Sequence, residues 1–502
     1  MEGEEENRLY FGDNLDILQR YIASESVDLV YLDPPFNSDA TYNVLFREHN
    51  GTDAAAQIRV FEDTWHWDLS AARAYQETVE AGGKVSEALQ AFRKLVGDSD
   101  MLAYVSMMAP RLKELHRVLK PTGSIYLHCD PTASHYLKLL MDAVFVGGFQ
   151  SEVIWSYRRW PTKTKNYQHM HDILLYYVKG RPPVFNVLYE PASESFLHRF
   201  KGKANILDKG ATKKRPSEKD TPGLPMRDVW EISIIAGSSK ERLGYPTQKP
   251  LALLERVIEV SSNRDQVVLD PFCGCGTTID AAQKLGRGWI GIDITHLAIN
   301  LLRHRLCDAY GEGIYKTFTV IGEPTTVSDA RVLAERDRYQ FQWWALGLVG
   351  ARPAETKKGA DKGIDGRLYF HDDPGSQKTK QIVFSVKAGK PSVAHVRDLR
   401  GVVEREQAEM GVMISMLSPT KDMRTEAANA GFYESSWGKH PRIQLLTISD
   451  LLAGKHIDMP PATGANVTFK KGRKNSPDSP LQMRLRETEE GYGADSELNL
   501  YR

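Results

Sequence analysis

One short stretch of the sequence combines a carboxylate, two prolines and an aromatic ring in a pattern that could perform chemistry. The apolar run at residues 26–32 ends at Asp33, and Pro34, Pro35 and Phe36 follow directly. This pattern predicts a buried strand that stops at a carboxylate. Proline has no N–H to donate, so backbone carbonyl oxygens remain as acceptors beside that carboxylate. Such a site suits an amino group on a flat ring, but a purely structural strand-to-turn motif is the alternative for this stretch alone.

A second stretch, far along the chain, has the composition of a nucleotide-binding loop. The apolar residues 267–269 run into Asp270, and Gly274 and Gly276 follow before a predicted helix. Glycines after a strand let a ligand approach the backbone closely. About 20 residues further on, another predicted strand ends at Asp293, where doubly wound folds hold ribose hydroxyls. Together these features favour a ligand site over an ordinary strand-to-helix turn.

The two stretches resemble motifs of one known family, the β-class DNA amino-methyltransferases that use S-adenosylmethionine. Residues 33–36 match the catalytic motif of the family, and residues 270–277 match its cofactor loop. Residues 245–250, Tyr-Pro-Thr-Gln-Lys-Pro, resemble its Pro-Thr-Gln-Lys-Pro signature. The catalytic motif precedes the cofactor loop, with a long insert between them, which is the order of the β-class. The resemblance covers about the first three-fifths of the chain.

The resemblance implies roles for individual residues. The carboxylate and the proline carbonyl of the catalytic motif accept hydrogen bonds from the exocyclic amine of a base, and the aromatic ring stacks on that base. The implied catalytic residues are Asp33, Pro34, Pro35 and Phe36. The residues implied to bind S-adenosylmethionine are Asp13, Asp33, Thr247, Gln248, Lys249, Asp270, Pro271, Phe272, Gly274, Gly276, Thr277 and Asp293. An ordinary helix cap is an equal alternative for Asp13.

The reaction implied by the resemblance is methyl transfer to the N6 amine of adenine in double-stranded DNA. The motif begins with Asp33 rather than with the serine frequent in cytosine-N4 enzymes, which favours adenine. Because the amine cannot be reached inside a duplex, the base must be flipped out. No metal is required for this step. Methylation of cytosine N4, of RNA or of a protein amide stays open, as does a DNA-binding module with a vestigial cofactor pocket.

Length and composition indicate a globular protein of several domains. A chain of 502 residues with 41% apolar and 26% charged residues is too long for one ordinary core. The four cysteines show neither a disulfide framework nor zinc-ligand spacing. No apolar run reaches about 18 residues, and residues 1–6 are acidic, unlike a signal peptide. We therefore expect a cytoplasmic protein with no metal in the methyltransferase unit and no membrane partner.

Predicted helices and strands divide the chain into α/β units. Residues 1–150 and 245–321 are expected to form the catalytic and cofactor-binding halves of a Rossmann-like methyltransferase sheet with circularly permuted motif order. A continuous helix is expected over residues 69–96. The other expected units are a basic target-recognition insert at 151–244, a linker at 322–335, a smaller restriction-endonuclease-like α/β domain at 336–456 and a flexible tail at 457–502.

Positive charge is concentrated in residues 151–219. This stretch has fourteen Lys and Arg residues against six Asp and Glu residues, a net charge of +8 in a protein whose formal net charge is zero. Interleaved aromatic residues are typical of surfaces that meet phosphates and bases. A solvated face is the alternative, but β-class enzymes place target recognition between these same motifs. The DNA contacts expected from the pattern are Arg158, Arg159, Lys163, Lys165, Lys213, Lys214 and Arg215.

A homodimer is a further implication of the resemblance.

The pattern in residues 336–456 resembles the Mrr-like branch of the PD-(D/E)XK nucleases. Asp365 and Lys387 match the branch, in which Gly-x-Asp-x-Gly-Ile-Asp precedes a strand with Glu-x-Lys or Gln-x-Lys. Ser385 stands at the Glu position, and Gln342 stands where the family often has Glu. A serine hydroxyl is a poor substitute for a carboxylate that holds Mg²⁺. We expect a degenerate nuclease fold that contributes DNA contacts. An active Mg²⁺-dependent endonuclease, in a single-chain restriction and modification enzyme, is the alternative.

Overall fold

The computed structural model describes residues 7–35, 41–44, 58–62, 66–160, 165–192, 194–200, 203–206, 215–220, 223–239, 241–245, 247–354, 363–372 and 379–461. Among the expected site residues, Phe36, Lys163, Lys213 and Lys214 lie outside these ranges. Arg215 is described by its backbone alone, and residues 462–502 of the expected tail are not described.

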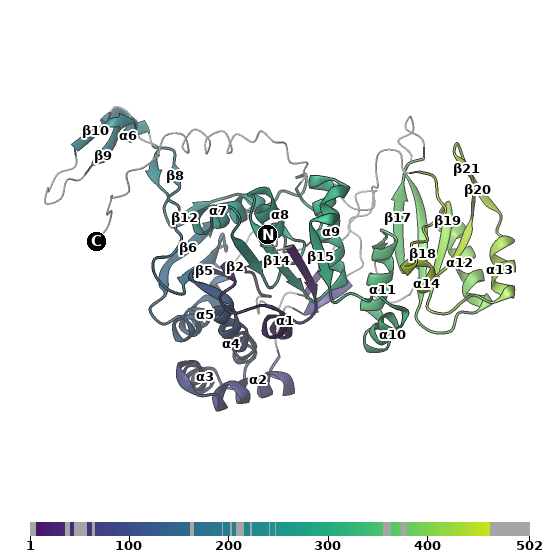
Figure 1. Ribbon diagram of the computed structural model, residues 1–502, viewed down its shortest axis with the longest axis horizontal. Helices are drawn as coiled ribbons and strands as arrows, with labels where there is room; N and C mark the ends of the chain where they lie inside the picture. Colours follow the sequence, from purple (N-terminus) through teal and green to yellow (C-terminus); the bar gives the residue numbers. More distant parts are fainter. Residues whose placement is uncertain are drawn as a thin grey trace, which may run out of the picture.

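A sheet of nine strands forms the centre of the larger unit, in the order β12-β6-β7-β5-β2-β13-β14-β1-β15 (Figure 1). β7 runs antiparallel to both of its neighbours, and all the other adjacent pairs are parallel. The expected Rossmann-like sheet is therefore confirmed. Its strands are β1 (Asn7–Phe11), β2 (Val27–Leu32), β5 (Leu119–Cys129), β6 (Phe149–Ser156), β7 (His171–Val178), β12 (Val229–Glu231), β13 (Val267–Asp270), β14 (Gly288–Asp293) and β15 (Phe318–Ile321).

Helices cover both faces of this sheet, because successive side chains of a strand point to opposite faces. Val30 and Leu32 of β2 pack with one group of helices, and Leu29 and Tyr31 pack with the other. The first group is α1 (Asn14–Tyr21), α2 (Leu69–Glu80), α3 (Gly83–Val96), α4 (Asp100–Val118) and α5 (Pro131–Val144). The second is α7 (Leu251–Ser261), α8 (Thr277–Lys284) and α9 (His296–Tyr310), which the 3-10 helix η1 (Glu312–Lys316) follows. No helix in the described part of the chain is long and apolar enough to cross a membrane.

The structure corrects the expected helix over 69–96. That segment forms two helices, α2 and α3, with a break at Gly82 and Gly83. These two glycines have φ of +72° and +79°, values that other residues rarely adopt and that end a right-handed helix.

The insert at 151–244 is also less separate than expected. β6, β7 and β12 belong to the main sheet, so only the remainder projects from it. This remainder contains short elements, namely β8 (Tyr189–Glu190), α6 (Glu194–Phe200), β9 (Lys203–Ile206), β10 (Arg215–Asp220) and β11 (Leu224–Pro225). A further hairpin follows β2, formed by β3 (Thr41–Val44) and β4 (Ile58–Glu62).

A second sheet organises the C-terminal unit, in the order β16-β17-β18-β19-β22. The expected linker at 322–335 contains most of α10 (Val327–Arg336), whose Ala330 and Ala334 are buried in the C-terminal core, so this core begins earlier than expected. The other elements are α11 (Arg338–Leu348), β16 (Arg352–Pro353), β17 (Gly366–Phe370), β18 (Lys380–Lys387), α12 (Val393–Arg405), β19 (Met410–Ser415), α13 (Lys421–Ala428), β20 (Phe432–Ser435), β21 (Gly438–Pro441), β22 (Ile443–Thr447) and α14 (Ile448–Leu452).

Candidate active site

The strand order brings the two sequence motifs together at the centre of the main sheet. β2 and β13 are adjacent and parallel, with Leu269 paired to Val30. From β2 the chain continues to β5 on one side, and from β13 it continues to β14 on the other. Open parallel sheets bind ligands at such a switch point, beyond the carboxyl ends of the strands. Asp33 follows β2 and Asp270 ends β13, so both carboxylates lie at that edge.

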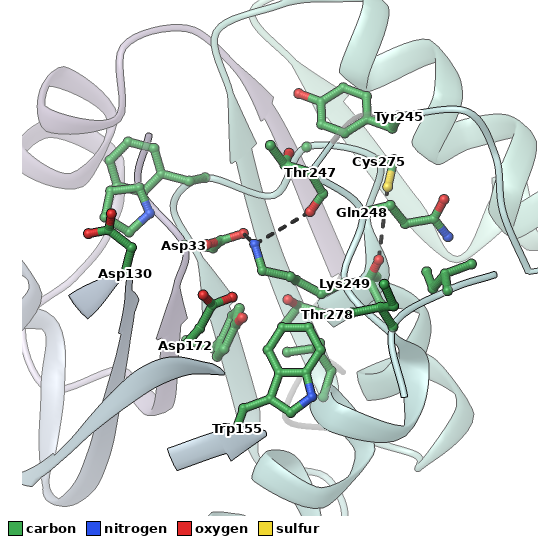
Figure 2. Close-up of a pocket in the computed structure, with 18 of the residues that line it drawn as sticks. Asp33, Asp130, Trp155, Asp172, Tyr245, Thr247, Gln248, Lys249, Cys275 and Thr278 are labelled. Carbon is green, nitrogen blue, oxygen red and sulfur yellow. Dashed lines mark hydrogen bonds and ion pairs between the residues drawn. The ribbon is translucent and has the colours of Figure 1, made fainter. Parts of the chain in front are cut away.

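A cavity of about 610 Å³ lies at this edge (Figure 2), a size typical of cofactor and ligand sites. Residues of the insert, including Trp155, Tyr157 and Asp172, form part of its wall. The expected catalytic and cofactor-binding residues that line the cavity are Asp33, Pro34, Pro35, Thr247, Gln248, Lys249, Asp270, Phe272, Gly274, Thr277 and Asp293. Asp13, Pro271 and Gly276 are described but are not among the lining residues. The structure therefore joins the expected catalytic and cofactor residues in one cavity.

Asp33 forms an ion pair inside the cavity. Lys249 Nζ donates a hydrogen bond to Asp33 Oδ2 and lies 3.5 Å from the backbone oxygen of Thr247, as Figure 2 shows. Both side chains of the pair are largely buried, with 15% of Asp33 and 13% of Lys249 exposed. A charge-assisted bond of this kind fixes the orientation of the carboxylate. Lys249 was expected from the sequence to bind the cofactor. Its ion pair with Asp33 was not expected and comes from the structure.

A buried histidine network lies behind Asp33, and the sequence analysis missed it. Tyr31 Oη and His128 Nδ1 share a hydrogen bond of 2.7 Å, and His128 Nε2 lies 3.3 Å from Asp172 Oδ2. Tyr157 Oη donates to the other oxygen of Asp172 over 3.1 Å. Burial alone would raise the pKa of Asp172, but its hydrogen bonds with His128 and Tyr157 and the nearby charge of Lys249 lower the pKa on balance. The position of His128 within an apolar strand was the available signal.

The cofactor loop is held by the acid at the end of β14. Asp293 Oδ2 accepts a hydrogen bond of 2.9 Å from the backbone N–H of Gly274, and Oδ1 accepts bonds from the backbone and hydroxyl of Thr295. Burial raises the pKa of Asp293. Gly274 has φ of +48°, and a Cβ there would lie 3.1 Å from the ring of Tyr245. The loop is thus fixed in a tight conformation that suits glycine.

Asp13 caps the start of α1, which was the alternative to a role in cofactor binding. Its side chain accepts hydrogen bonds from the backbone N–H groups of Leu15 and Asp16, and Arg111 Nη2 lies 2.9 Å from its Oδ2. The neighbouring Asn14 donates to the backbone oxygen of Pro271 over 2.8 Å. The start of α1 therefore supports the cofactor loop through Asn14, a contact that the sequence analysis did not identify.

Replacement of Asp270 by asparagine is expected to remove a pH dependence of stability. Burial raises the pKa of Asp270 to about 7, although hydrogen bonds from Thr278 and from the N–H of Phe272 act in the opposite direction. Because the folded state binds this proton more tightly than the unfolded chain, the contribution to stability is complete below about pH 4 and is lost as the pH rises to about 7. Denaturant titrations from about pH 5 to about pH 8 should show a steeper fall in the free energy of unfolding for the wild type than for Asp270→Asn. Equal slopes would contradict this assignment.

Three of the expected DNA-contact residues have described side chains. Arg158, Arg159 and Lys165 are exposed. The guanidinium carbon of Arg159 lies 5.0 Å from the centre of the Tyr157 ring, and Arg159 also lines the cavity. Trp160 is 92% exposed on the same loop. One basic side chain, Arg159, and one aromatic side chain, Tyr157, therefore line this side of the cavity.

The nuclease-like residues also come together in the C-terminal unit. Lys387 Nζ lies 3.8 Å from Asp365 Oδ2, which accepts a hydrogen bond from the N–H of Val386. Gln342 Nε2 donates to Asp365 Oδ1 over 3.2 Å. Ser385 is buried and, two residues before Lys387 on β18, shares its face of the strand. Among the described residues, no group of three or more His, Cys, Asp or Glu side chains could hold a metal ion.

The expected catalytic motif and the expected cofactor loop share one cavity at the switch point, as the resemblance to DNA methyltransferases implies. Residues 27–303, more than half of the chain, match the family model described as DNA methylase, of the N6 and N4 type. The chain belongs to this family. The expected class of enzyme, a DNA methyltransferase that uses S-adenosylmethionine, is thereby confirmed. Residues 339–453 match a second model, described as NACHT-associated inactive Restriction Endonuclease 1, which agrees with the nuclease-like fold expected there.

Curated relatives align with the same part of the chain. Type II methyltransferase M.HpaI of Haemophilus parainfluenzae is 33% identical over 255 residues, which are 50% of this chain and 74% of the relative. DNA adenine methyltransferase YhdJ of Escherichia coli is 27% identical over 310 residues, which are 61% of this chain and 84% of the relative. Among solved structures, the complex of M1.HpyAVI with S-adenosylmethionine is 18% identical, covers 60% of this chain and 99% of its own, and has a TM-score of 0.32.

Proposed function

We propose that this enzyme transfers a methyl group from S-adenosylmethionine to the N6 amine of a flipped-out adenine in double-stranded DNA. The observation that carries the proposal is the cavity that Asp33 and Pro34 share with Gly274 and Asp293. Adenine is favoured over cytosine because the motif begins with Asp33 rather than serine. The relative YhdJ is named as an adenine methyltransferase, which agrees with this choice.

The residues present suit the methyl donor. Gly274 and Phe272 of the cofactor loop both line the cavity, so the loop offers a ligand its backbone and an apolar ring. Asp293 and Thr277 add polar groups that can receive or donate hydrogen bonds. We assign these four residues, with Thr247, to cofactor binding. S-adenosylmethionine supplies an electrophilic methyl group on a positively charged sulfur.

Asp33 is assigned to activate the target amine. The lone pair of this amine is delocalised into the adenine ring, which makes the nitrogen a poor nucleophile. Hydrogen bonds from the two amino hydrogens to the Asp33 carboxylate and the Pro34 carbonyl would draw the nitrogen towards a tetrahedral geometry and localise the lone pair. The nitrogen then forms a bond to the methyl carbon as the bond from carbon to sulfur breaks. The carboxylate stabilises the positive charge that develops on nitrogen and is placed to accept the released proton.

Among the acids that line the cavity, Asp33 has the pairing best suited to this role. Asp130, Asp172, Asp270 and Asp293 all contact backbone N–H groups or rigid aromatic side chains. Asp33 Oδ2 is paired with the end of a lysine side chain, Lys249, and Asp33 Oδ1 lies 3.9 Å from His128 Nδ1. A lysine stem has several rotatable bonds, so its ammonium can move aside when an amine enters.

Transfer of labelled methyl groups tests the proposal. Purified full-length protein, labelled S-adenosylmethionine and unmethylated DNA should give labelled N6-methyladenine after digestion to nucleosides, and an equal mass of RNA should receive no label. Label in N4-methylcytosine would reassign the target base. Label in RNA alone would contradict the DNA assignment.

The exposed basic side chains near the cavity mouth are proposed to contact DNA phosphates. Arg158→Ala is expected to reduce the slope of log affinity against log salt concentration by about 1, because one fewer counterion is released on binding. Fluorescence anisotropy with a labelled duplex at several salt concentrations measures this slope. Lys94→Ala is the control, since Lys94 is exposed on α3 and does not line the cavity. Equal slopes for the wild type and Arg158→Ala would contradict the assignment.

The C-terminal unit is proposed to be an inactive nuclease fold. Asp365 and Lys387 lie close together, but Ser385 offers a hydroxyl where an Mg²⁺ site needs a carboxylate. The matched model is itself described as inactive. Supercoiled DNA should therefore stay intact with the full chain and Mg²⁺, and nicking that Lys387→Ala abolishes would establish the alternative, an active endonuclease.

A homodimer stays a prediction, which analytical ultracentrifugation of the full chain can test.

A further inference from the structure

Helix α11 connects the C-terminal unit to the wall of the methyltransferase cavity. Figure 1 shows α11 between α9 and the strands of the second sheet. Trp343 of α11 is 5% exposed and packs in a cluster with Cys275 of the cofactor loop and with Leu297 and Leu301 of α9. Tyr245 and Leu243 pack against the same cluster. A side chain of the C-terminal unit therefore lies directly behind the cofactor loop.

Hydrogen bonds reinforce this contact. Gln340 Oε1 accepts a bond of 3.0 Å from the backbone N–H of His296, the first residue of α9. Asn300 Nδ2 donates to the backbone oxygen of Trp343 over 3.3 Å. The two helices are close-packed, because a Cβ at Gly347 would lie 2.2 Å from Asn300 Nδ2. The contact is thus specific in both its apolar and its polar parts.

The partners of Trp343 belong to the cavity itself. Cys275 and Tyr245 both line the cavity, as Gln248 and Thr247 do, and Figure 2 labels all four. The ring of Tyr245 also packs beside Gly274, whose N–H is bonded to Asp293. Trp343 itself does not line the cavity. It supports two segments that do, and both are assigned to cofactor binding.

The next residue along the same helix packs in a different core. Trp344 is 2% exposed and packs with Phe341 in the core of the nuclease-like unit. Gln342, between them, donates to Asp365 of the nuclease-like residues. Adjacent tryptophans on one helix thus belong to two different cores, which offers an unusually close experimental control.

We propose that Trp343 is a positioning residue for the methyl donor, through which the nuclease-like unit holds the cofactor loop in its binding conformation. The inference deepens the proposed function and rests on it. Its physical basis is that Gly274 and Gly276 have φ of +48° and +76°, so packing must select this loop conformation from the many that glycine permits. When the binding-competent fraction of a site falls, the apparent Kd rises in inverse proportion.

Calorimetric titration of the full-length protein with S-adenosylmethionine, without DNA, tests the inference. Trp343→Ala is expected to weaken binding about 10-fold, as a competent fraction of about one tenth would do. Trp343→Phe, which keeps an aromatic ring in the cluster, should recover most of the affinity. Trp344→Ala should lower the thermal stability of the C-terminal unit but leave the affinity within about 2-fold of the wild type. In steady-state kinetics, Trp343→Ala should raise KM for S-adenosylmethionine and leave KM for DNA unchanged.

Several results would overturn the inference. Equal weakening by Trp343→Ala and Trp344→Ala would mean that general destabilisation is responsible, and unchanged binding by a folded Trp343→Ala would mean that the contact has no effect. If Trp343→Ala does not fold, Gln340→Ala removes only the bond to His296 and should still weaken binding; no change in that variant would count against the inference. Failure of the wild type to bind S-adenosylmethionine would instead contradict the proposed function.

Discussion

Asp33→Asn is expected to lower the rate of methyl transfer by about 10²-fold to 10³-fold. The variant keeps the size of the side chain but replaces the negative charge that is assigned to stabilise the developing positive charge on nitrogen. Single-turnover measurements with saturating S-adenosylmethionine and DNA give this rate without the contribution of product release. The affinity for S-adenosylmethionine, measured by calorimetry, shows whether the cavity is still formed.

Asp130→Asn is a matched control for this prediction. Asp130 also lines the cavity, but its carboxylate caps α5 by accepting a hydrogen bond from the N–H of Ala133. Asparagine caps helices as well as aspartate does, so this variant should retain the wild-type rate and stability. Equal losses of rate in the two variants would contradict the assignment of Asp33, because they would mean that any lost carboxylate in the cavity has the same effect.

Gly276→Ala is expected to have the largest effect on the cofactor loop. Gly276 precedes α8 in the left-handed conformation, with φ of +76° and ψ of +35°. A Cβ there would lie 2.5 Å from Cγ of Leu302, which is fully buried on α9. Backbone strain and overpacking together should lower the free energy of unfolding by about 2–4 kcal/mol. Displacement of the loop should also abolish measurable binding of S-adenosylmethionine. Gly276 thus shapes the loop from outside the cavity.

Gly286→Ala separates these two causes. Gly286 follows α8, has φ of +70° and would place a Cβ no closer than 3.6 Å to the side chain of Arg264, an ordinary contact. Only strain of about 1–2 kcal/mol is expected, with unchanged affinity for S-adenosylmethionine. Denaturant titration and calorimetry of both variants measure the difference. If Gly276→Ala binds the cofactor as well as Gly286→Ala does, the loop does not need this conformation.

The centre of the site could be predicted from the sequence because it depends on local patterns. Apolar runs that end at Asp33 and at Asp270 predict strands whose carboxyl ends carry the functional groups. Parallel strands present these ends at one edge, and the pairing of β2 with β13 places the two motifs side by side there. Motif residues such as Gly274 could therefore be identified without knowledge of how the chain packs.

The supporting contacts could not be predicted in this way, because they join residues far apart in the chain. His128 and Asp172 meet only because β5 pairs with β7. This pairing was not predicted, because the basic composition of residues 151–219 indicated a separate insert. Trp343 was predicted to be outside the methyltransferase unit, yet it packs behind the cofactor loop. The start of α10 could have been predicted from the sequence, since Thr326 and Asp329, which form its capping box, are only three residues apart.

Mass spectrometry of nucleosides shows directly whether the enzyme methylates adenine in DNA through Asp33. Unmethylated DNA is incubated with S-adenosylmethionine and either the wild type or Asp33→Asn, and the digested nucleosides are identified by mass. We expect N6-methyladenine from the wild type and at most about a hundredth of that amount, at early times, from a variant that still binds S-adenosylmethionine. Equal yields of N6-methyladenine from both proteins, or no methylated base from a wild type that binds S-adenosylmethionine and DNA, would contradict this expectation.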